Sequence, residues 1–174
     1  LAKARTEDVQ NNLALISQLT ERMAKITGQL KAFARKSALQ LGPVSVRRAL
    51  ANVQALLEQR LRTERIVIAE NWVEDDVEVR GEANRLEQVL VNLIVNALDA
   101  MKGSPVRHLE VCVLESARRV TIAVRDTGPG IAPELLPRIF EGLRLPGGSA
   151  PGSLGVGLSI VRHLAVLHGG SVEA

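Results

Sequence analysis

The order of helical and strand patterns along the chain predicts an α/β (α+β) two-layer sandwich, with helices on one face of a mixed sheet and a long bundle helix in front. Two observations carry this prediction. Residues 1–40 form one helical pattern, and from residue 42 onward amphipathic helical stretches alternate with short strand-like stretches. Hydrophobic residues make up 46% of the 174 residues and aromatic residues only 2%, so we expect an aliphatic core in the domain 42–174.

The front helix, residues 1–40, carries an apolar seam at spacings of three and four. Leu13 and Leu15 widen the stripe, which favours a multi-helix bundle over a two-stranded coil. Because an unpaired seam would expose a large apolar patch, we expect a homodimer through this helix. The seam residues are Val9, Asn12, Ile16, Leu19, Met23, Ile26, Leu30 and Phe33.

The domain that follows shows a regular succession of elements, beginning after the break at Leu41-Gly42-Pro43. Residues 141–157 are rich in Gly, Pro and Ser and predict a mobile loop. The expected helices are Val46–Arg60, Ala83–Met101, a short one around Pro133–Phe140, and Ser159–His168. The expected strands are Ile66–Ala69, Val77–Val79, and a hairpin of Leu109–Glu115 with Arg119–Asp126.

Composition excludes several classes of protein. The net charge is +3, but the charges are mixed along the chain without a block of one sign, so we expect no nucleic-acid partner. The single cysteine, Cys112, excludes an internal disulfide and a Cys-based zinc cluster, and its apolar alternating context predicts a buried structural thiol. No apolar run reaches the length of about 18 residues that spans a bilayer, so we expect no membrane contact by this chain.

Two asparagines on the strongest helix are the first candidate site residues. Asn92 and Asn96 lie four residues apart, which brings both amides to one helix face. Amide oxygens are neutral ligands that suit Mg²⁺, a cation that keeps waters and borrows phosphate oxygens. The alternative interpretation is a pair of solvent-facing or capping asparagines.

Two glycine-rich turns are the other candidates. In the turn Asp126–Ile131, a carboxylate follows a strand directly and can accept from an exocyclic amine, while its glycines permit close backbone approach. The alternative is an ordinary Asp-Thr-Gly turn. The stretch Gly152–Ser159 opens a helix, whose free N–H groups favour phosphate. A dinucleotide-binding motif is not expected here, because no strand closely precedes the turn.

Together, in this order, the three elements resemble the ATPase superfamily of gyrases, heat-shock chaperones, histidine kinases and mismatch-repair proteins. Asn92–Ala97 matches its N box, and Phe140-Glu141 matches the start of its F box. Asp126–Gly130 and Gly155–Gly157 match its two glycine boxes. The flanking Arg85–Leu90 is similar to the version found in sensor histidine kinases. The resemblance covers about residues 42–173.

The resemblance implies a site for Mg²⁺ and ATP. Asn92 and Asn96 occupy the catalytic positions, with Asn96 as the Mg²⁺ ligand, and Asp126 accepts from adenine. Residues 142–154 form the ATP lid. The further implied nucleotide contacts are Asp99, Gly128, Gly130, Ile131, Arg144, Gly155, Val156, Gly157 and Leu158.

One position favours phosphoryl transfer over ATP hydrolysis. Hydrolytic members of the superfamily carry a water-activating Glu where this chain has Asn92, and an amide cannot act as a general base. We therefore expect a protein-histidine kinase, with the acceptor histidine on the dimerisation hairpin. Two alternatives stay open: a serine/threonine kinase of the anti-sigma-factor type, which the long front helix argues against, and a non-catalytic scaffold.

The front helix fits a sensor kinase, in which it is the second helix of that hairpin, and Leu19–Lys36 is similar to four-carbon dicarboxylate sensor kinases. The phospho-accepting histidine belongs on the first helix, so His108, His163 and His168 are interpreted as structural or surface residues. The implied partner is the receiver domain of a response regulator. The implied location is cytoplasmic, with an inner-membrane parent protein.

The chain departs from this family in two places. After Phe140-Glu141 the family continues with Pro-Phe, Ser or Thr residues and a Lys, whereas this chain reads Gly142–Pro146 with Arg144 as its nearby cation. Arg144 is therefore the candidate for the phosphate contact of the lid. The final strand of the family is also absent after Glu173, so we expect an unpaired sheet edge.

Overall fold

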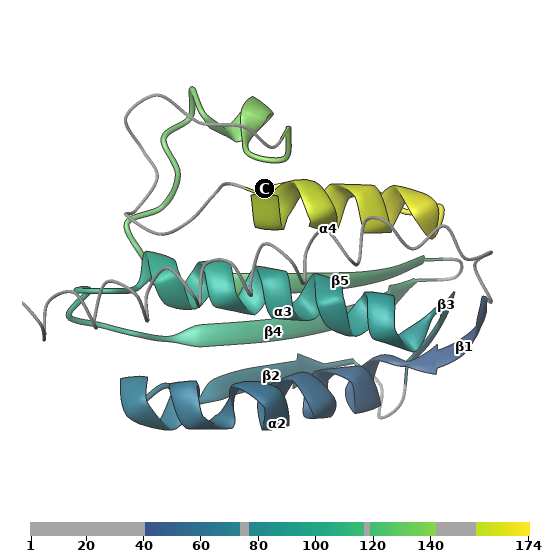
Figure 1. The fold of residues 1–174 in the computed structure, drawn as a ribbon, viewed down its shortest axis with the longest axis horizontal. Helices are drawn as coiled ribbons and strands as arrows, with labels where there is room; N and C mark the ends of the chain where they lie inside the picture. The colour runs from purple at the N-terminus through teal and green to yellow at the C-terminus, as the bar shows by residue number, and fades with distance from the viewer. Residues whose placement is uncertain (1–40, 74–76, 117–118, 142–155) are drawn as a thin grey trace, which may run out of the picture. The chain divides into compact units, whose positions relative to one another are not determined.

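The computed structural model describes residues 41–73, 77–116, 119–141 and 156–174 (Figure 1). The chain divides into two units, Leu1–Ala38 and Leu39–Ala174, and every described residue belongs to the second. The predicted front helix, its pairing and the predicted lid lie outside the described residues. None of the helices in the described ranges is long and apolar enough to cross a membrane.

A short strand that the sequence did not predict starts the described unit. β1 (Gly42–Ser45) pairs antiparallel with β3 (Glu78–Gly81). Its last residue, Ser45, then caps α2 (Val46–Glu64), because the Ser45 hydroxyl accepts from the Arg48 N–H at 3.2 Å. α2 runs four residues beyond the predicted end at Arg60, and it stops at Arg65, which takes a left-handed φ of 54°.

The main sheet is mixed, as predicted. Its order is β2-β4-β5, in which β2 (Ile68–Trp72) runs parallel to β4 (Leu109–Ser116), and β4 forms an antiparallel pair with β5 (Arg119–Asp126). Both strands of the predicted hairpin are confirmed. β2 begins two residues later than predicted and β3 one residue later, because in each case the ladder to the partner strand, and not the local apolar run, fixes the bounds.

The core lies between the helices and one face of this sheet. α3 (Ala83–Ala100) contributes Leu90, Ile94 and Leu98, each 0% exposed. From β4, Leu109, Val111 and Val113 are also 0% exposed and belong to the same cluster. Because alternate residues of a strand point to opposite faces, the helices cover the face that these three residues occupy.

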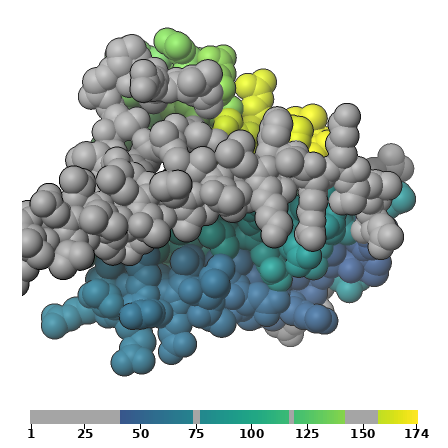
Figure 2. Space-filling view, in the orientation of Figure 1, coloured from purple at the N-terminus to yellow at the C-terminus, as the bar shows by residue number. Residues whose placement is uncertain are grey.

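The other face of β4 carries the free cysteine. Cys112 is 4% exposed, whereas Leu114, further along on the same face, is 48% exposed. Burial raises the pKa of the Cys112 thiol, and the neighbouring Glu110 raises it further. The predicted buried thiol is thus confirmed. On the helical side, the outer side chains of α2 form a surface of the described unit (Figure 2), where Leu56 is 71% exposed.

Two elements near the end of the chain differ from the prediction. The expected helix around Pro133–Phe140 is only a 3-10 turn, η1 (Leu136–Arg138), because two prolines in six residues limit its backbone hydrogen bonds. The last helix, α4 (Val156–Leu167), begins three residues before the predicted Ser159. It lies beside α3 (Figure 1), and Gly169 follows it with a φ of 74°.

Candidate nucleotide-binding site

The two predicted amides lie together on the side of α3 that faces α4. A Cβ placed on Gly157 would lie 3.3 Å from Asn92 Oδ1 and 3.4 Å from Asn96 Nδ2. Asn92 Nδ2 donates to the Gln88 carbonyl at 2.9 Å. Since a carbonyl only accepts, this bond leaves Asn92 Oδ1, a potential ligand oxygen, on the side of Gly157. Both asparagines are half-buried.

The start of α4 lies beside the amides of Asn92 and Asn96, and together they form one end of the candidate site. Gly157 and Leu158 belong to the first turn of α4, which begins at Val156, so Gly157 is helical and not part of a loop as the sequence predicted for 141–157. The first N–H groups of a helix have no partner within it and attract anions. A Cβ at position 157 would come into close contact with both amides.

The other end of the site is the turn after β5. Asp126 is exposed, and its Oδ1 accepts from the Gly128 N–H at 2.8 Å, which closes a local turn. Gly128 packs so closely that a Cβ there would lie 3.1 Å from Ala100 Cβ and 2.7 Å from Asp126 Oδ1. Gly130 takes a φ of 75°, a left-handed value that favours glycine.

Thr127, which the sequence analysis did not single out, anchors this turn. Its hydroxyl oxygen accepts from the His108 N–H at 2.9 Å and lies 3.0 Å from the Val106 carbonyl, to which it donates. It also lies 3.6 Å from Met101 Sδ. Thr127 therefore ties the Asp126 turn to the segment that joins α3 to β4. The contacts come from residues about 20 positions away, so local sequence carries no signal for them.

α3 connects the two ends of the site. Asn92 contacts the α4 side and Ala100 contacts the turn at Gly128, a separation of about 12 Å along the helix axis. Ile131 follows the turn and is 46% exposed. A ligand along this side of α3 would meet a carboxylate at one end, and amides with a helix N-terminus at the other.

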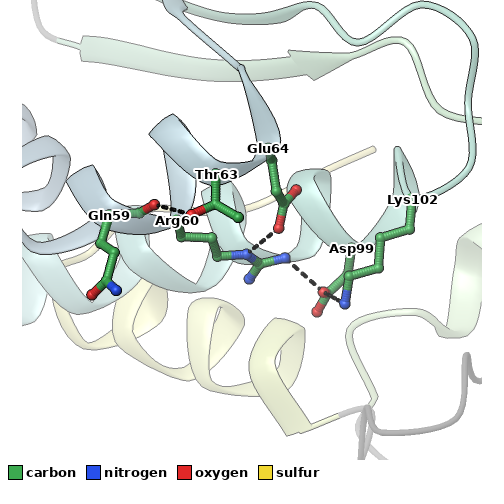
Figure 3. Close-up of polar contacts among 6 residues, drawn as sticks. All are labelled: Gln59, Arg60, Thr63, Glu64, Asp99 and Lys102. Atoms are coloured by element: carbon green, nitrogen blue, oxygen red, sulfur yellow. Dashed lines mark hydrogen bonds and ion pairs between the residues drawn. The ribbon is translucent and has the colours of Figure 1, made fainter.

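Asp99 takes part in an ion-pair network on the α2 side of α3 (Figure 3). Arg60 Nη2 and Lys102 Nζ each lie 2.8 Å from Asp99 Oδ1, and Arg60 Nε lies 2.7 Å from Glu64 Oε1. Burial by itself would raise the pKa of Asp99, but the hydrogen bonds and charges of Lys102 and Arg60 outweigh it and lower the pKa. Burial opposes the charge of Arg60 too, yet its two carboxylate partners raise the pKa of the guanidinium.

Some predicted contacts lie outside what the structure describes. Arg144 and Gly155 belong to the stretch 142–155, and for Val156 only the backbone is described. Leu158 is half-buried. The described candidate site therefore comprises Asn92, Asn96, Asp126, Gly128, Gly130, Ile131, Gly157 and Leu158, with Asp99 beside it.

These elements are those of a known ATPase family. Residues 81–174 match the histidine kinase-, DNA gyrase B- and HSP90-like ATPase family, and the chain belongs to it. The match includes both asparagines, the Asp126 turn and the start of α4.

The relatives that the chain matches are sensor histidine kinases. The C4-dicarboxylate transport sensor protein DctB of Rhizobium meliloti (strain 1021) is 32% identical over 173 residues, which cover 99% of this chain and 27% of that protein. A solved catalytic domain of the histidine kinase ThkA is 26% identical, with a TM-score of 0.61, over 72% of this chain and 80% of that one. Full-length ShkA in complex with AMPPNP is 28% identical, with a TM-score of 0.69, over 89% of this chain and 32% of that one.

The predicted resemblance to dicarboxylate sensor kinases is thus confirmed, and so is the histidine-kinase-type fold. The chain spans about a quarter of the length of the curated relatives it matches: 27% of the Rhizobium meliloti protein and 28% of the DctB protein of Pseudomonas aeruginosa.

Proposed function

We propose that this chain is the catalytic part of a sensor histidine kinase. It binds Mg-ATP and transfers the γ-phosphoryl group to a histidine on a dimerisation hairpin, for relay to an aspartate of a response regulator. The single observation that carries the proposal is the placement of both glycine motifs against one side of α3. Gly157 lies at Asn92 and Asn96, and Gly128 lies at Ala100.

The donor and acceptor groups of the site fit a magnesium nucleotide. Asp126 offers an exposed carboxylate to the exocyclic amine of adenine, and Gly128 keeps the surface of the turn free of a side chain. Asn92 and Asn96 offer amide oxygens that suit Mg²⁺, and the first turn of α4 offers N–H groups to phosphate. Bound Mg²⁺ would neutralise charge on the phosphates. Arg144 is the candidate cation for the γ-phosphate.

The residues at the phosphate end support transfer over hydrolysis. Asn92 directs its Nδ2 to Gln88 and its Oδ1 toward Gly157, so it has no basic group for activating water. The attacking group is then an imidazole nitrogen supplied from elsewhere: a nitrogen–phosphorus bond forms while the bond from phosphorus to the ADP oxygen breaks. We also propose homodimerisation through residues 1–40, a receiver-domain partner and a cytoplasmic location.

Nucleotide binding is tested by calorimetric titration with ADP and ATP, with and without Mg²⁺. We expect the unmodified chain to bind both, and Asn96→Ala to lose affinity only when Mg²⁺ is present. A matched control is Asn52→Ala, which removes an amide from α2 that donates to Glu87 at 2.7 Å. This variant should bind as the unmodified chain does. Absence of nucleotide binding by the unmodified chain would favour a non-catalytic scaffold.

Phosphoryl transfer is tested with labelled ATP and a separate fragment that carries the first hairpin helix of a sensor kinase. We expect acid-labile label on the fragment and none on this chain. Acid-stable label would favour the serine/threonine kinase alternative. Label on His108, His163 or His168 would contradict their assignment as structural or surface residues.

A further inference from the structure

His168, directly after α4, joins two elements that are 86 positions apart in sequence. Its Nδ1 lies 2.7 Å from the Leu164 carbonyl, and its Nε2 lies 3.2 Å from the backbone N–H of Glu82. A carbonyl only accepts and an N–H only donates. Nδ1 therefore carries the proton, and Nε2 accepts.

The N–H of Glu82 stands at the start of α3, where the helix lacks another cap. Glu82 occupies the N-cap position, and its side chain makes no capping hydrogen bond. The imidazole instead bonds to the backbone there. Gly81, the preceding residue, is buried, and a Cβ on it would lie 3.1 Å from His168 Cδ2. The ring is thus seated against the backbone at the junction of β3 and α3.

α3 and α4 pack against each other, and this contact lies at the end of their packing opposite the candidate phosphate site. Gly157 to His168 spans about 17 Å along α4, while Glu82 lies about 15 Å from Asn92 and 21 Å from Asn96 along α3. The two helices are antiparallel (Figure 1), so His168 lies at one end of their contact and Gly157 at the other.

We propose that His168 is a positioning residue for the nucleotide site. By bonding to the Glu82 N–H, it fixes where α4 lies along α3, and thereby the distance between the first turn of α4 and the amides of Asn92 and Asn96. This inference rests on the proposed function, because it assigns the position of α4 a role in binding phosphate. His168 itself stays about 17 Å from the phosphate end.

Two amide variants separate the effects of the two hydrogen bonds of His168, one to the Leu164 carbonyl and one from the Glu82 N–H. In His168→Gln, the longer side chain presents its oxygen where Nε2 stands, and it can accept from Glu82. In His168→Asn, the shorter amide keeps only the local bond to Leu164. We expect the Kd for Mg-ADP to rise roughly fivefold in His168→Asn and His168→Ala, and to stay within about twofold of the unmodified value in His168→Gln.

A second substitution, at Gly81, tests the same contact of the His168 ring. Gly81→Ala should press on His168 and raise the Kd, but it should have no further effect in a His168→Ala background, because the ring it contacts is gone. Val53→Ala, at a buried core residue of α2, controls for a general loss of stability. It should lower the unfolding midpoint and leave the Kd unchanged.

The measurements are calorimetric titration and urea unfolding followed by the fluorescence of Trp72, the single tryptophan. Loss of affinity in His168→Asn, with rescue in His168→Gln, supports the proposal. Equal nucleotide affinities in all folded variants overturn it. An equal loss of affinity in Val53→Ala, when that variant is as stable to urea as His168→Asn, also overturns it. If the unmodified chain binds no nucleotide, the proposed function itself fails. That outcome differs from failure of the His168 proposal, in which the unmodified chain binds nucleotide and the variants bind it equally well.

Discussion

The polar groups of α3 that bond to α2 are arranged differently from those that face α4. On the α2 side they bond to one another: Arg60 pairs with Asp99 at 2.8 Å, and Asn52 donates to Glu87 at 2.7 Å. On the α4 side, Asn92 Oδ1 and the amide of Asn96 face a glycine. The α2 side is therefore built for stability, while the α4 side leaves acceptor and donor groups for a ligand. Substitutions on the two sides should have separable effects.

The largest expected effect on affinity is at the turn after β5. Asp126→Asn should keep the fold, since an amide oxygen can still accept from the Gly128 N–H. It should weaken Mg-ADP binding by about 1.5–3 kcal/mol, because a charged acceptor is replaced by a neutral one. Calorimetric titration of both proteins measures this loss. Unchanged affinity would rule out a role for Asp126 in binding adenine.

The next effect tests the α4 side directly. Gly157→Ala adds a Cβ 3.3 Å from Asn92 Oδ1, which must then shift. We expect the Kd for Mg-ATP to rise roughly tenfold, as the loss of about one hydrogen bond to the ligand implies. Stability should hold or increase, because Ala is the better helix former by about 1 kcal/mol. Thermal unfolding and titration of the same samples would separate the two quantities. A parallel loss of both would contradict the division between the two sides.

The α2 side should respond in the opposite way. Asp99→Asn removes the shared partner of Arg60 and Lys102, and we expect a loss of roughly 1–3 kcal/mol in the free energy of unfolding, between the values for exposed and buried pairs. The Kd for nucleotide should change little. A large loss of affinity without a loss of stability would instead restore Asp99 as a nucleotide contact, as the family resemblance implies.

Acidic pH provides a smaller perturbation of the same pair. Because the folded-state pKa of Asp99 is lowered, its contribution to stability is present above the unfolded value of about 3.9 and is lost as the pH falls through the folded pKa. The stability difference between the unmodified chain and Asp99→Asn should be full at pH 7 and should shrink below about pH 4. Urea unfolding at several pH values tests this, and a constant difference would contradict it.

Much of this arrangement could be predicted from sequence, because it depends on local periodicity. The helix expected at Ala83–Met101 ends one residue earlier in the structure, and β5 has its predicted bounds. The positions of Asn92, Asn96 and Asp126 relative to these elements were therefore also predictable. Each motif is contiguous and lies on an element with strong apolar patterning.

What could not be predicted depends on partners distant in sequence. β1 has no alternating pattern, and it is a strand only because β3 pairs with it. The Arg60–Asp99 pair joins residues 39 positions apart, and the bond from Glu82 to His168 joins residues 86 apart. His168 was interpreted as a structural or surface residue; its contacts put it in a structural position, and only its proposed link to the nucleotide site is new.

The most direct test of the central claim is hydrogen exchange of the chain with and without Mg-ADP. If the nucleotide lies along the α4 side of α3, protection should increase at Asp126–Gly130 and in the first turn of α4. The amides of α2 should exchange at the same rate in both states. Protection confined to α2, or no protection at either glycine motif while calorimetry shows binding, would contradict the account.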